Sequence, residues 1–428
     1  MQRMNALYEK LKDCSGISTD SRNIIEGSMF FALRGENFDA NKFARQALDK
    51  GAKYAVIDNP DYQDSDKMIL TDDVLTTLQE LAGFHRKQMK AKLVAITGSN
   101  GKTTTKELIH ASLSSHYNTL ATRGNLNNHI GVPLTLLRIT EETEYAIIEM
   151  GANHIGEIAR LCEIADPDYG LITNVGQAHL EGFGSFEGVK KAKSELYKYL
   201  QYRGACFINK DNQQLLSMID DQKTISYAFK EQAWCKANLI REDGFAGLHW
   251  KCDKKSGHFV SRLRGTYNGE NLLAAVCVAS YMGVPAKKTD AALSGYIPSN
   301  QRSEIRETKK NTLFLDMYNA NPSSMLLAIK DFIDPFDKQA LILGDMKELG
   351  ETSDELHKLI LQVVSKLEFN KVFLSGPEFY KHRKKYPFDF YQTTSALKSA
   401  LQQSDLSGYH IMIKGSRSMS LEQIIETL

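Results

Sequence analysis

The sequence predicts an α/β protein of three domains: a small α/β domain, a central domain with a mostly parallel sheet, and a smaller doubly wound domain. The chain has 428 residues, and at roughly 100–200 residues per domain this length allows two to four domains. Apolar runs of strand length alternate with helical patterns along most of it, which is typical of parallel sheets covered by helices. With 42% hydrophobic and 25% charged residues, the composition is that of a globular protein with buried cores.

Residues 1–90 form the first predicted domain. A strand is expected at 28–33, a helix at 43–52 that ends at a glycine, and a second strand at 54–58. This order of elements predicts a small α/β unit.

Residues 91–298 form the second predicted domain, where strand patterns are repeatedly followed by helical ones. The expected strands lie at 92–97, 144–149, 169–173 and 205–209, and the expected helices at 102–116, 155–164 and 187–201. Such alternation favours a mostly parallel sheet with helices on its faces.

Residues 299–428 form the third predicted domain, whose start is placed at the break I-P-S-N. Strand patterns separated by helical stretches recur here at 313–316, 340–344, 371–376 and 410–416. They predict a second, smaller, Rossmann-like sheet.

Charge and cysteine usage exclude several classes of protein. The net charge of +1 gives no reason to expect a nucleic acid or an anionic membrane as partner. None of the six cysteines lies within four residues of another, so zinc-type and redox pairs are not expected, and the cysteines suit a reducing compartment as small core residues. The N-terminal stretch is too charged for a signal peptide, and no run approaches the ~18 apolar residues of a membrane span. We therefore expect a cytoplasmic protein without membrane insertion.

The stretch K-L-V-A-I-T-G-S-N-G-K-T-T-T-K-E-L-I, residues 92–109, reads as a strand, a tight turn and a helix start. This context predicts a phosphate loop, although it is shorter than the usual one. Backbone N–H groups of residues 99–102 would face phosphate oxygens, Lys102 would contact the β- and γ-phosphates, and Thr103 would offer its hydroxyl to Mg²⁺. The alternative is a glycine-rich turn with a surface lysine. The predicted ATP-binding residues of the loop are Gly98, Ser99, Asn100, Gly101, Lys102, Thr103 and Thr104.

Two further side chains follow predicted strands of the same sheet. Glu149 ends the strand at 144–149, where ligands of open α/β sheets bind, and it is a candidate Mg²⁺ ligand or else a solvated glutamate. His179 lies in the glycine-rich loop N-V-G-Q-A-H-L-E-G-F-G-S, although a lone histidine is more often structural. Neither residue by itself identifies the reaction.

Taken together, these motifs resemble those of the Mur ligase superfamily, the ATP-dependent amide-forming ligases of peptidoglycan precursor synthesis. T-G-S-N-G-K-T-T is similar to that superfamily's own short phosphate loop. T-Y-N-G-E-N resembles its paired-asparagine adenine contact, and Q-R-S-E and F-L-D-M-Y-N-A-N-P-S-S resemble its nucleotide-site arginine and aspartate. The resemblance covers nearly the whole chain.

Three stretches are most similar to the branch of the superfamily that adds D-alanyl-D-alanine to UDP-N-acetylmuramoyl-tripeptide. They are Y-N-A-N-P-S-S, L-G-D-M-K-E-L-G-E followed by His357, and T-R-G-N-L-N-N-H-I-G-V-P. The branch that adds the third amino acid resembles the chain at S-T-D-S-R and F-F-A-L-R-G. Its Asn-Pro-Arg motif is missing, because Ser323 follows Asn321-Pro322.

The resemblance implies a reaction in which ATP phosphorylates the tripeptide carboxylate and the dipeptide amine attacks the acyl phosphate. Glu149 and Thr103 would hold one Mg²⁺, and His179 would help to bind a second. Lys193 matches a family lysine that is often carbamylated, and Lys102, Glu149, His179 and Lys193 are the expected catalytic group. Adenine would contact Asn268, Asn271 and Asn319, and the ribose and phosphates Arg302 and Asp316.

The resemblance also implies substrate contacts. The UDP group would bind to Ser21, Arg22, Gly35 and Asn37, and the muropeptide to Asn125, Asn128 and His129. The dipeptide would contact Tyr318, Asn321 and Ser324. A monomer is expected, with a hinge around residues 295–302 that closes the site. The alternatives are another amide ligase of the superfamily, a P-loop kinase or ATPase, and a binding protein that has lost the chemistry. The third residue of the tripeptide, diaminopimelate or lysine, stays open.

Overall fold

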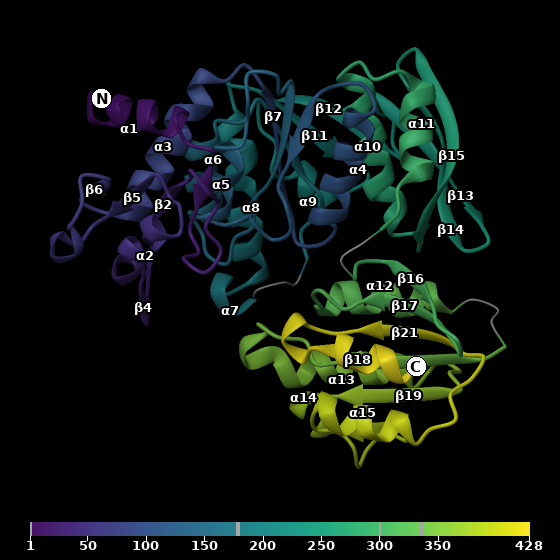
Figure 1. Ribbon diagram of the computed structural model, residues 1–428. Helices are drawn as coiled ribbons and strands as arrows, with labels where there is room; N and C mark the ends of the chain where they lie inside the picture. The colour runs from purple at the N-terminus through teal and green to yellow at the C-terminus, as the bar shows by residue number, and fades with distance from the viewer. Residues whose placement is uncertain (1, 177–179, 299–300, 334–336) are drawn as a thin grey trace.

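The computed structural model describes residues 2–176, 180–298, 301–333 and 337–428. Three large sheets lie in succession along the chain, each covered by helices, and a two-stranded hairpin accompanies the first (Figure 1). The predicted three-domain α/β fold is therefore confirmed. None of the helices in these ranges is long and apolar enough to span a bilayer.

The N-terminal sheet is parallel, with the order β1-β2-β5-β6. Its buried strand β2 alternates sides, since Phe30 faces one core and Met29 and Phe31 face another. The predicted strands at 28–33 and 54–58 and the helix at 43–52 correspond to β2, β5 and α2. The elements are α1 Gln2–Lys12, β1 Ile17–Ser18, β2 Met29–Phe31, β3 Arg34–Gly35, β4 Phe38–Asp39, η1 Ala40–Phe43, α2 Ala44–Asp49, β5 Tyr54–Ile57, η2 Pro60–Tyr62, β6 Met68–Leu70 and α3 Val74–Gln88.

The central sheet has nine strands in the order β15-β14-β13-β12-β11-β10-β7-β9-β8. Strand β7, which precedes the predicted phosphate loop, lies between β10 and β9 and is parallel to both. Its elements are β7 Lys92–Thr97, α4 Lys102–Ser114, β8 Thr119–Ala121, α5 Gly131–Leu136, β9 Tyr145–Glu149, α6 Glu157–Ala165, β10 Tyr169–Ile172, α7 Leu180–Phe183, α8 Phe186–Leu200, β11 Ala205–Asn209, α9 Gln213–Leu216, β12 Lys223–Ala228, β13 Cys235–Glu242, β14 Phe245–Cys252, β15 Lys255–Arg264, α10 Asn268–Tyr281 and α11 Ala286–Gly295.

Helices cover both faces of this sheet, which explains why its strands read as continuous apolar runs. Val94 and Ile96 of β7 pack in the core beneath α4 and α10, whereas Leu93 and Ala95 pack in the core beneath α6 and α8. Because both faces of β7 are buried, its end has a fixed position relative to the sheet, and so does the turn that follows.

An antiparallel ribbon, β13 to β15, extends the central sheet beyond its parallel part. It was not among the predicted elements. Cys235 and Cys252 lie directly opposite each other in β13 and β14 and form a disulfide. The expectation that all six cysteines are separate small core residues is therefore wrong for this pair, because strand register brings together two residues that are far apart in sequence.

The C-terminal sheet has the order β16-β17-β21-β18-β19-β20 and is parallel except for β16. The four strands predicted in this domain correspond to β17, β18, β19 and β21. The elements are β16 Glu304–Glu307, β17 Thr312–Asp316, α12 Pro322–Phe332, β18 Gln339–Gly344, η3 Gly350–Thr352, α13 Ser353–Val364, β19 Lys371–Ser375, α14 Pro377–Tyr380, β20 Asp389–Tyr391, α15 Thr394–Gln402, β21 His410–Lys414, η4 Arg417–Met419 and η5 Leu421–Thr427.

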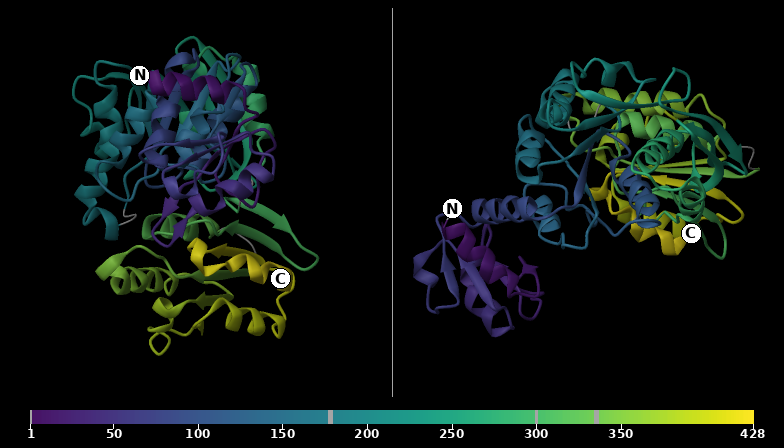
Figure 2. Two further views of the ribbon diagram at one scale, coloured as in Figure 1. Left: turned by 60° about the vertical axis from the view of Figure 1, so that its left-hand side comes forward. Right: turned by 90° about the horizontal axis from the view of Figure 1, so that it is seen from above.

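The N-terminal and C-terminal domains both adjoin the central domain. Figures 1 and 2 show the N-terminal domain beside the central domain, joined to it through α3, and the C-terminal domain beneath the central sheet. Helix α3 packs on α5 and α6. This arrangement brings the carboxyl ends of strands from two sheets to the same region.

Candidate active site

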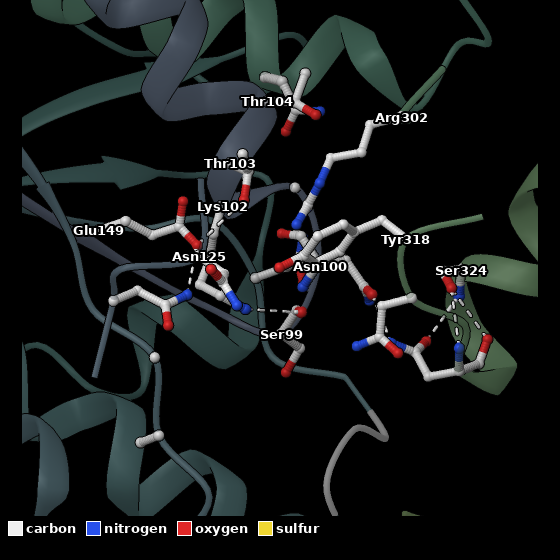
Figure 3. A pocket seen from close by; sticks show the side chains of 18 of the residues that line it. Ser99, Asn100, Lys102, Thr103, Thr104, Asn125, Glu149, Arg302, Tyr318 and Ser324 are labelled. Atoms are coloured by element: carbon white, nitrogen blue, oxygen red, sulfur yellow. Dashed lines mark hydrogen bonds between the residues drawn. The ribbon is translucent and has the colours of Figure 1, made fainter. Parts of the chain in front are cut away.

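A cavity of about 1040 Å³ lies between the central and C-terminal domains (Figure 3). The ends of β7 and β9 meet it from one side, and the ends of β17 and β21 from the other. Eighteen of the predicted site residues line it: Ser99, Asn100, Gly101, Lys102, Thr103, Thr104, Asn125, Asn128, His129, Glu149, Asn268, Asn271, Arg302, Asp316, Tyr318, Asn319, Asn321 and Ser324.

The turn between β7 and α4 requires two glycines. Gly98 has φ +142°, and a Cβ there would lie 2.0 Å from Oγ1 of Thr173. Gly101 has φ +77°, and a Cβ there would lie 2.6 Å from Oδ1 of Asn271. A side chain at either position would meet both an unfavourable backbone conformation and a close contact.

Asn174, at the end of the neighbouring strand, holds this turn. The amide of Ser99 donates to its carbonyl at 3.0 Å and the amide of Asn100 to its Oδ1 at 3.0 Å. These two amides are therefore not free for a phosphate, which corrects the prediction that all four from residue 99 to 102 would face one. The amides of Gly101 and Lys102 donate to no residue in the described ranges.

Lys102 folds back onto its own turn. Its Nζ donates to the carbonyls of Gly98 at 2.7 Å and Ser99 at 3.2 Å. The side chain faces the cavity but protein atoms crowd it, and this burial lowers its pKa to about 8, with Glu149 opposing the shift and Arg302 adding to it. Two of the three N–H groups of the ammonium are therefore used within the turn, and one is left for a phosphate oxygen.

Glu149 and Thr103 form the polar centre of the cavity wall. Oε1 of Glu149 accepts from Oγ1 of Thr103 at 3.1 Å and from Nδ2 of Asn127 at 2.8 Å. Its Oε2 is buried and has no hydrogen-bond partner among the residues that the structure describes, and Nζ of Lys106 lies 3.9 Å from it. Lys106 is fully buried and donates to the carbonyl of Thr122 at 2.6 Å.

Lys106 and Asn127 are site residues that the sequence analysis missed. The signal for Lys106 was its spacing, since it follows Lys102 by four residues and therefore lies on the same face of α4. The sequence carried no comparable signal for Asn127, which stands beside two other asparagines.

The pair of oxygen ligands at this point fits a magnesium ion. Mg²⁺ prefers oxygen ligands at about 2.1 Å in an octahedron, which places neighbouring ligands about 3.0 Å apart. The two oxygens of Thr103 and Glu149 are separated by 3.1 Å. In the described part of the chain no cluster of three or more His, Cys, Asp and Glu residues could hold a metal ion.

Lys193 lies on α8 and is 2% exposed. Its Nζ is 5.3 Å from the ring centroid of Phe183. Burial lowers its pKa to about 7, and the nearby charge of Lys102 contributes, while Glu157 and Glu195 oppose. His179, its predicted companion, lies outside the described residues.

The two asparagines predicted to contact adenine are hydrogen-bonded within the protein. Nδ2 of Asn271 donates to Oδ1 of Asn268 at 3.0 Å, and Nδ2 of Asn268 donates to the carbonyl of Arg264 at 2.7 Å. Thr105 of α4 donates to Oδ1 of Asn271 at 3.1 Å. The pair therefore also ties α10 to the helix that follows the phosphate loop.

The C-terminal domain contributes two cations to the cavity lining, Arg302 and Lys414. The guanidinium of Arg302 lies 3.7 Å from the ring centroid of Tyr318. Figure 3 shows the two side chains next to each other. Lys414, which is 1% exposed, donates to Asp316. This second pair follows from register, because Asp316 and Lys414 end adjacent parallel strands. Lys414 was not predicted, since 98 residues separate it from Asp316.

Asn321 connects the two domains directly. Its Oδ1 accepts from the amide of Ser324 at 2.9 Å and so caps α12, and Ser324 returns the bond as in a capping box. Its Nδ2 donates to Oδ1 of Asn100 in the phosphate loop at 2.7 Å. The start of α12 and the phosphate loop are thus in contact.

The segment predicted to line the muropeptide path borders the same cavity. Asn128 accepts from the amides of Ile130 and Gly131 at 3.1 and 2.9 Å, and so it has a structural task at the start of α5. Gln79 of α3 donates to the carbonyl of His129 at 3.0 Å.

The residues predicted to bind UDP do not line this cavity. They occupy two segments of the N-terminal domain, around residue 21 and in the hairpin β3–β4. Arg22 pairs with Asp20 at 2.8 Å and holds the pKa of that carboxyl at about 2, and Lys50 donates to the carbonyl of Ser21 at 2.8 Å.

Sequence models of the Mur ligase family match almost all of the chain. The Mur ligase family catalytic domain matches residues 13–95, the Mur ligase middle domain residues 96–279, and the Mur ligase glutamate ligase domain residues 301–417. The three matches follow one another without overlap.

Individual relatives of known sequence or structure belong to the same family. UDP-N-acetylmuramoyl-tripeptide–D-alanyl-D-alanine ligases of Bacillus subtilis (strain 168) and Escherichia coli (strain K12) are 34% and 35% identical, each over 96% of this chain and 93% of the relative. MurF from Acinetobacter baumannii superposes with a TM-score of 0.89 at 28% identity, covering 99% of this chain and 97% of that one. MurF ligase from Thermotoga maritima in complex with ADP gives 0.86 at 26% identity, covering 97% of each. The chain therefore belongs to the Mur ligase family, among the UDP-N-acetylmuramoyl-tripeptide–D-alanyl-D-alanine ligases.

Proposed function

We propose that this protein joins D-alanyl-D-alanine to UDP-N-acetylmuramoyl-tripeptide, with ATP converted to ADP and phosphate, and so makes the pentapeptide precursor of peptidoglycan. The observation that carries the proposal is one cavity in which the phosphate loop and Glu149 face the segment from Tyr318 to Ser324 of another domain. The names of the relatives described above specify the two substrates.

The reaction proceeds through an acyl phosphate. The tripeptide carboxylate attacks the γ-phosphorus, the bond to the β-phosphate oxygen breaks, and ADP leaves. The dipeptide amine then attacks the carbonyl carbon, loses a proton, and phosphate departs as the amide forms. Two anions must approach each other in the first step, and preorganised positive charge lowers that barrier. Lys102 and the start of α4 supply such charge next to Thr103 and Glu149.

Thr103 and Glu149 would hold the magnesium ion that neutralises the β- and γ-phosphates. His179 would serve a second ion. Lys193 would contribute as a carbamate, because a buried amine with a pKa of about 7 is largely neutral above that pH, and a neutral amine can react with carbon dioxide. An ammonium at this position would instead repel the metal.

The nucleotide would lie across the boundary between two domains. Asn268, Asn271 and Asn319 would surround the adenine, and Arg302 and Asp316 would bind the ribose and phosphates. Because residues 91–298 carry the phosphate loop and residues 299–428 carry Arg302 and Asp316, closure about a hinge at 295–302 would complete the site and exclude water from the acyl phosphate.

The two peptide substrates would enter from opposite sides. Asn125, Asn128 and His129 would line the path of the muropeptide, whose UDP group would bind to residues 1–90 through Ser21, Arg22, Gly35 and Asn37. Tyr318, Asn321 and Ser324 would face the dipeptide. We place this reaction in the cytoplasm, where ATP is available, and in a monomer.

A single assay tests the proposal. The protein is incubated with ATP, Mg²⁺, UDP-N-acetylmuramoyl-tripeptide and D-alanyl-D-alanine, and phosphate and product mass are followed. Phosphate release that requires both substrates, together with the pentapeptide mass, is expected. Release without the dipeptide would indicate an ATPase or kinase, and no turnover would indicate a binding protein.

A further inference from the structure

The segment L-G-D-M-K-E-L-G-E, residues 343–351, leads from the end of β18 to the cavity. In the C-terminal sheet β21 lies between β17 and β18. The loops that follow such neighbouring parallel strands are where open α/β sheets bind ligands. Glu348 lines the cavity together with Asp316 and Lys414, which end β17 and β21. It is not among the residues proposed to contact ATP or either peptide.

Glu348 has a backbone conformation that an L residue adopts only at a cost. Its φ is +63°, in the left-handed region. Side chains held in this way tend to lie at ligand sites. The side chain of Glu348 is exposed, and its carbonyl accepts from the amide of Glu181 in α7 at 3.5 Å. Figure 1 shows α7 on the side of the central domain that faces the C-terminal domain, so Glu348 lies where the two domains meet.

Asp345 anchors the start of this segment. It is fully buried, and its carboxylate accepts from the amides of Glu378 and Phe379 at 2.9 and 3.0 Å. Its own amide donates to the carbonyl of Ser375 at 3.0 Å, and its carbonyl accepts from the amide of Ser416 at 3.2 Å. Asp345 therefore ties the segment to the end of β19, to α14 and to the loop after β21.

His357 of α13 holds the next residue. Its Nδ1 lies 2.7 Å from the carbonyl of Ser353, which can only accept, so Nδ1 carries a proton and donates. Its Nε2 accepts from the amide of Met346 at 3.0 Å, which requires the neutral ring. Asp345 and Met346 thus have fixed positions, and Glu348 follows two residues later.

The dipeptide has an ammonium group, and the three residues proposed to face it carry no charge. Among the described C-terminal residues that line the cavity, the carboxylates are Asp316 and Glu348. Asp316 accepts from Lys414. Lys347 is directed toward Asp345, with its Nζ 4.0 Å from Oδ2. Because its side chain is exposed, Glu348 is the carboxylate of this wall that a cationic ligand can reach.

We propose that Glu348 recognises the ammonium group of the incoming dipeptide, and that Asp345 and His357 are positioning residues that hold Glu348 toward it. The inference rests on the proposed function, since it takes D-alanyl-D-alanine as the ligand. Hydrogen bonds between charged groups are stronger than those between neutral ones, so Glu348 selects peptides with a free amino terminus. It also orients the nitrogen that attacks the acyl phosphate.

Calorimetry on the full chain, with an ATP analogue and UDP-N-acetylmuramoyl-tripeptide present, tests the role of Glu348. The two ligands are D-alanyl-D-alanine and N-propionyl-D-alanine, which has the same carbon skeleton but no amine. The unaltered chain should bind the dipeptide about tenfold or more tightly, as expected for a hydrogen bond between charged groups. Glu348→Gln should lose this preference, and Glu348→Asp should keep part of it. Glu351→Gln is the matched control and should keep all of it, because Glu351 is exposed but is not among the described residues that line the cavity.

Two variants of His357 test the positioning role with the same pair of ligands. A glutamine amide can accept from Met346 and donate to Ser353 as the imidazole does, whereas phenylalanine can do neither. The preference for the dipeptide should therefore persist in His357→Gln and fall in His357→Phe. The KM for ATP should stay within about twofold in both variants, which a general loss of structure would not allow. If the phenylalanine variant did not fold, Asp345→Asn would replace it, since asparagine cannot accept both amides at the start of α14 in the same way.

The outcomes separate the two proposals. A full preference for the dipeptide in Glu348→Gln, or equal affinities of the unaltered chain for the two ligands, would overturn the role of Glu348. A full preference in His357→Phe, or in its replacement, would overturn the positioning role. Failure of the unaltered chain to bind or convert D-alanyl-D-alanine would contradict the proposed function itself.

Discussion

Lys106 is a fully buried lysine, and its burial is explained by the buried carboxylate of Glu149 beside it. It is 0% exposed, and of the carboxylates near it Glu149 is itself only 1% exposed. Taking a lysine and a glutamate out of water costs several kcal/mol for each ion, which their attraction offsets only while both are present. The positive charge of Lys106 therefore offsets part of the free-energy cost of burying Glu149.

We accordingly expect Lys106→Met to destabilise the fold by about 3–5 kcal/mol, the usual cost of leaving one member of a buried pair alone. Urea unfolding would measure it. Glu107→Gln is the matched control, because Glu107 also pairs with Lys106, at 2.9 Å, but its side chain is 31% exposed. That variant should lose less than about 1 kcal/mol. Equal losses in the two variants would show that Glu149 is not the partner that matters.

Lys102 makes nucleotide binding depend on pH. Its pKa is about 8 in the nucleotide-free protein, lowered chiefly by burial, and a triphosphate would raise it again by favouring the charged form. Above pH 8 binding must therefore take up a proton, so the affinity for ATP without metal should fall as pH rises from 8 to 9, by about fivefold. Calorimetry in buffers of different ionisation enthalpy would measure the uptake.

The control for this dependence is Lys102→Arg. Arginine stays charged throughout the range, so its affinity for ATP should lack the decline between pH 8 and 9. An equal decline in both proteins would assign the titration to another group. The same lowered pKa affects folding in the opposite direction: the unfolded chain binds more protons between pH 8 and the ordinary lysine value, so stability from this group rises with pH there.

At the scale of elements, the turn between β7 and α4 depends on glycine. Gly98→Ala is expected to abolish ADP binding, because the new Cβ would fall 2.0 Å from Oγ1 of Thr173. Gly156→Ala, also at positive φ but with no atom within 4 Å, isolates the backbone cost, about 1–2 kcal/mol, and should leave ADP binding intact. Thermal unfolding and calorimetry would compare them. Intact ADP binding in Gly98→Ala would contradict the steric argument.

Element boundaries show how much local pattern could predict. The apolar run at 92–97 and the strand at 205–209 match β7 and β11, since both-face burial leaves a clear signal in sequence. The ribbon β13–β15 was missed although β14 and β15 alternate between buried and exposed residues, and its strand pairing is decided by register. Lys414 and Asn127 were missed for the same reason: only the fold brings them beside Asp316 and Glu149.

At the scale of the whole molecule, the contact between Asn321 and Asn100 joins the C-terminal domain to the phosphate loop. Asn321→Ser separates its two tasks, because serine can still cap α12 but is too short to reach Asn100. We expect stability to change by less than about 1 kcal/mol. Turnover should fall about tenfold, the loss from about 1.4 kcal/mol of transition-state stabilisation, because closure is weakened.

Small-angle scattering with an ATP analogue and both substrates would measure closure directly. The unaltered chain should become more compact, and Asn321→Ser should do so less. Asn321→Ala, which loses the cap as well, is the control for a purely local effect and should be less stable than the serine variant. Identical scattering and turnover in Asn321→Ser and the unaltered chain would show that the contact between Asn321 and Asn100 has no role in closure.

The sequence by itself determined the three-domain α/β class, the phosphate loop, and most of the residues that line the cavity, because these depend on local periodicity, on glycines at one turn and on short motifs. Only the tertiary structure decided which charges neutralise one another and which amides of the loop remain free. Those properties depend on strand register and burial, and neither can be calculated from neighbours along the chain.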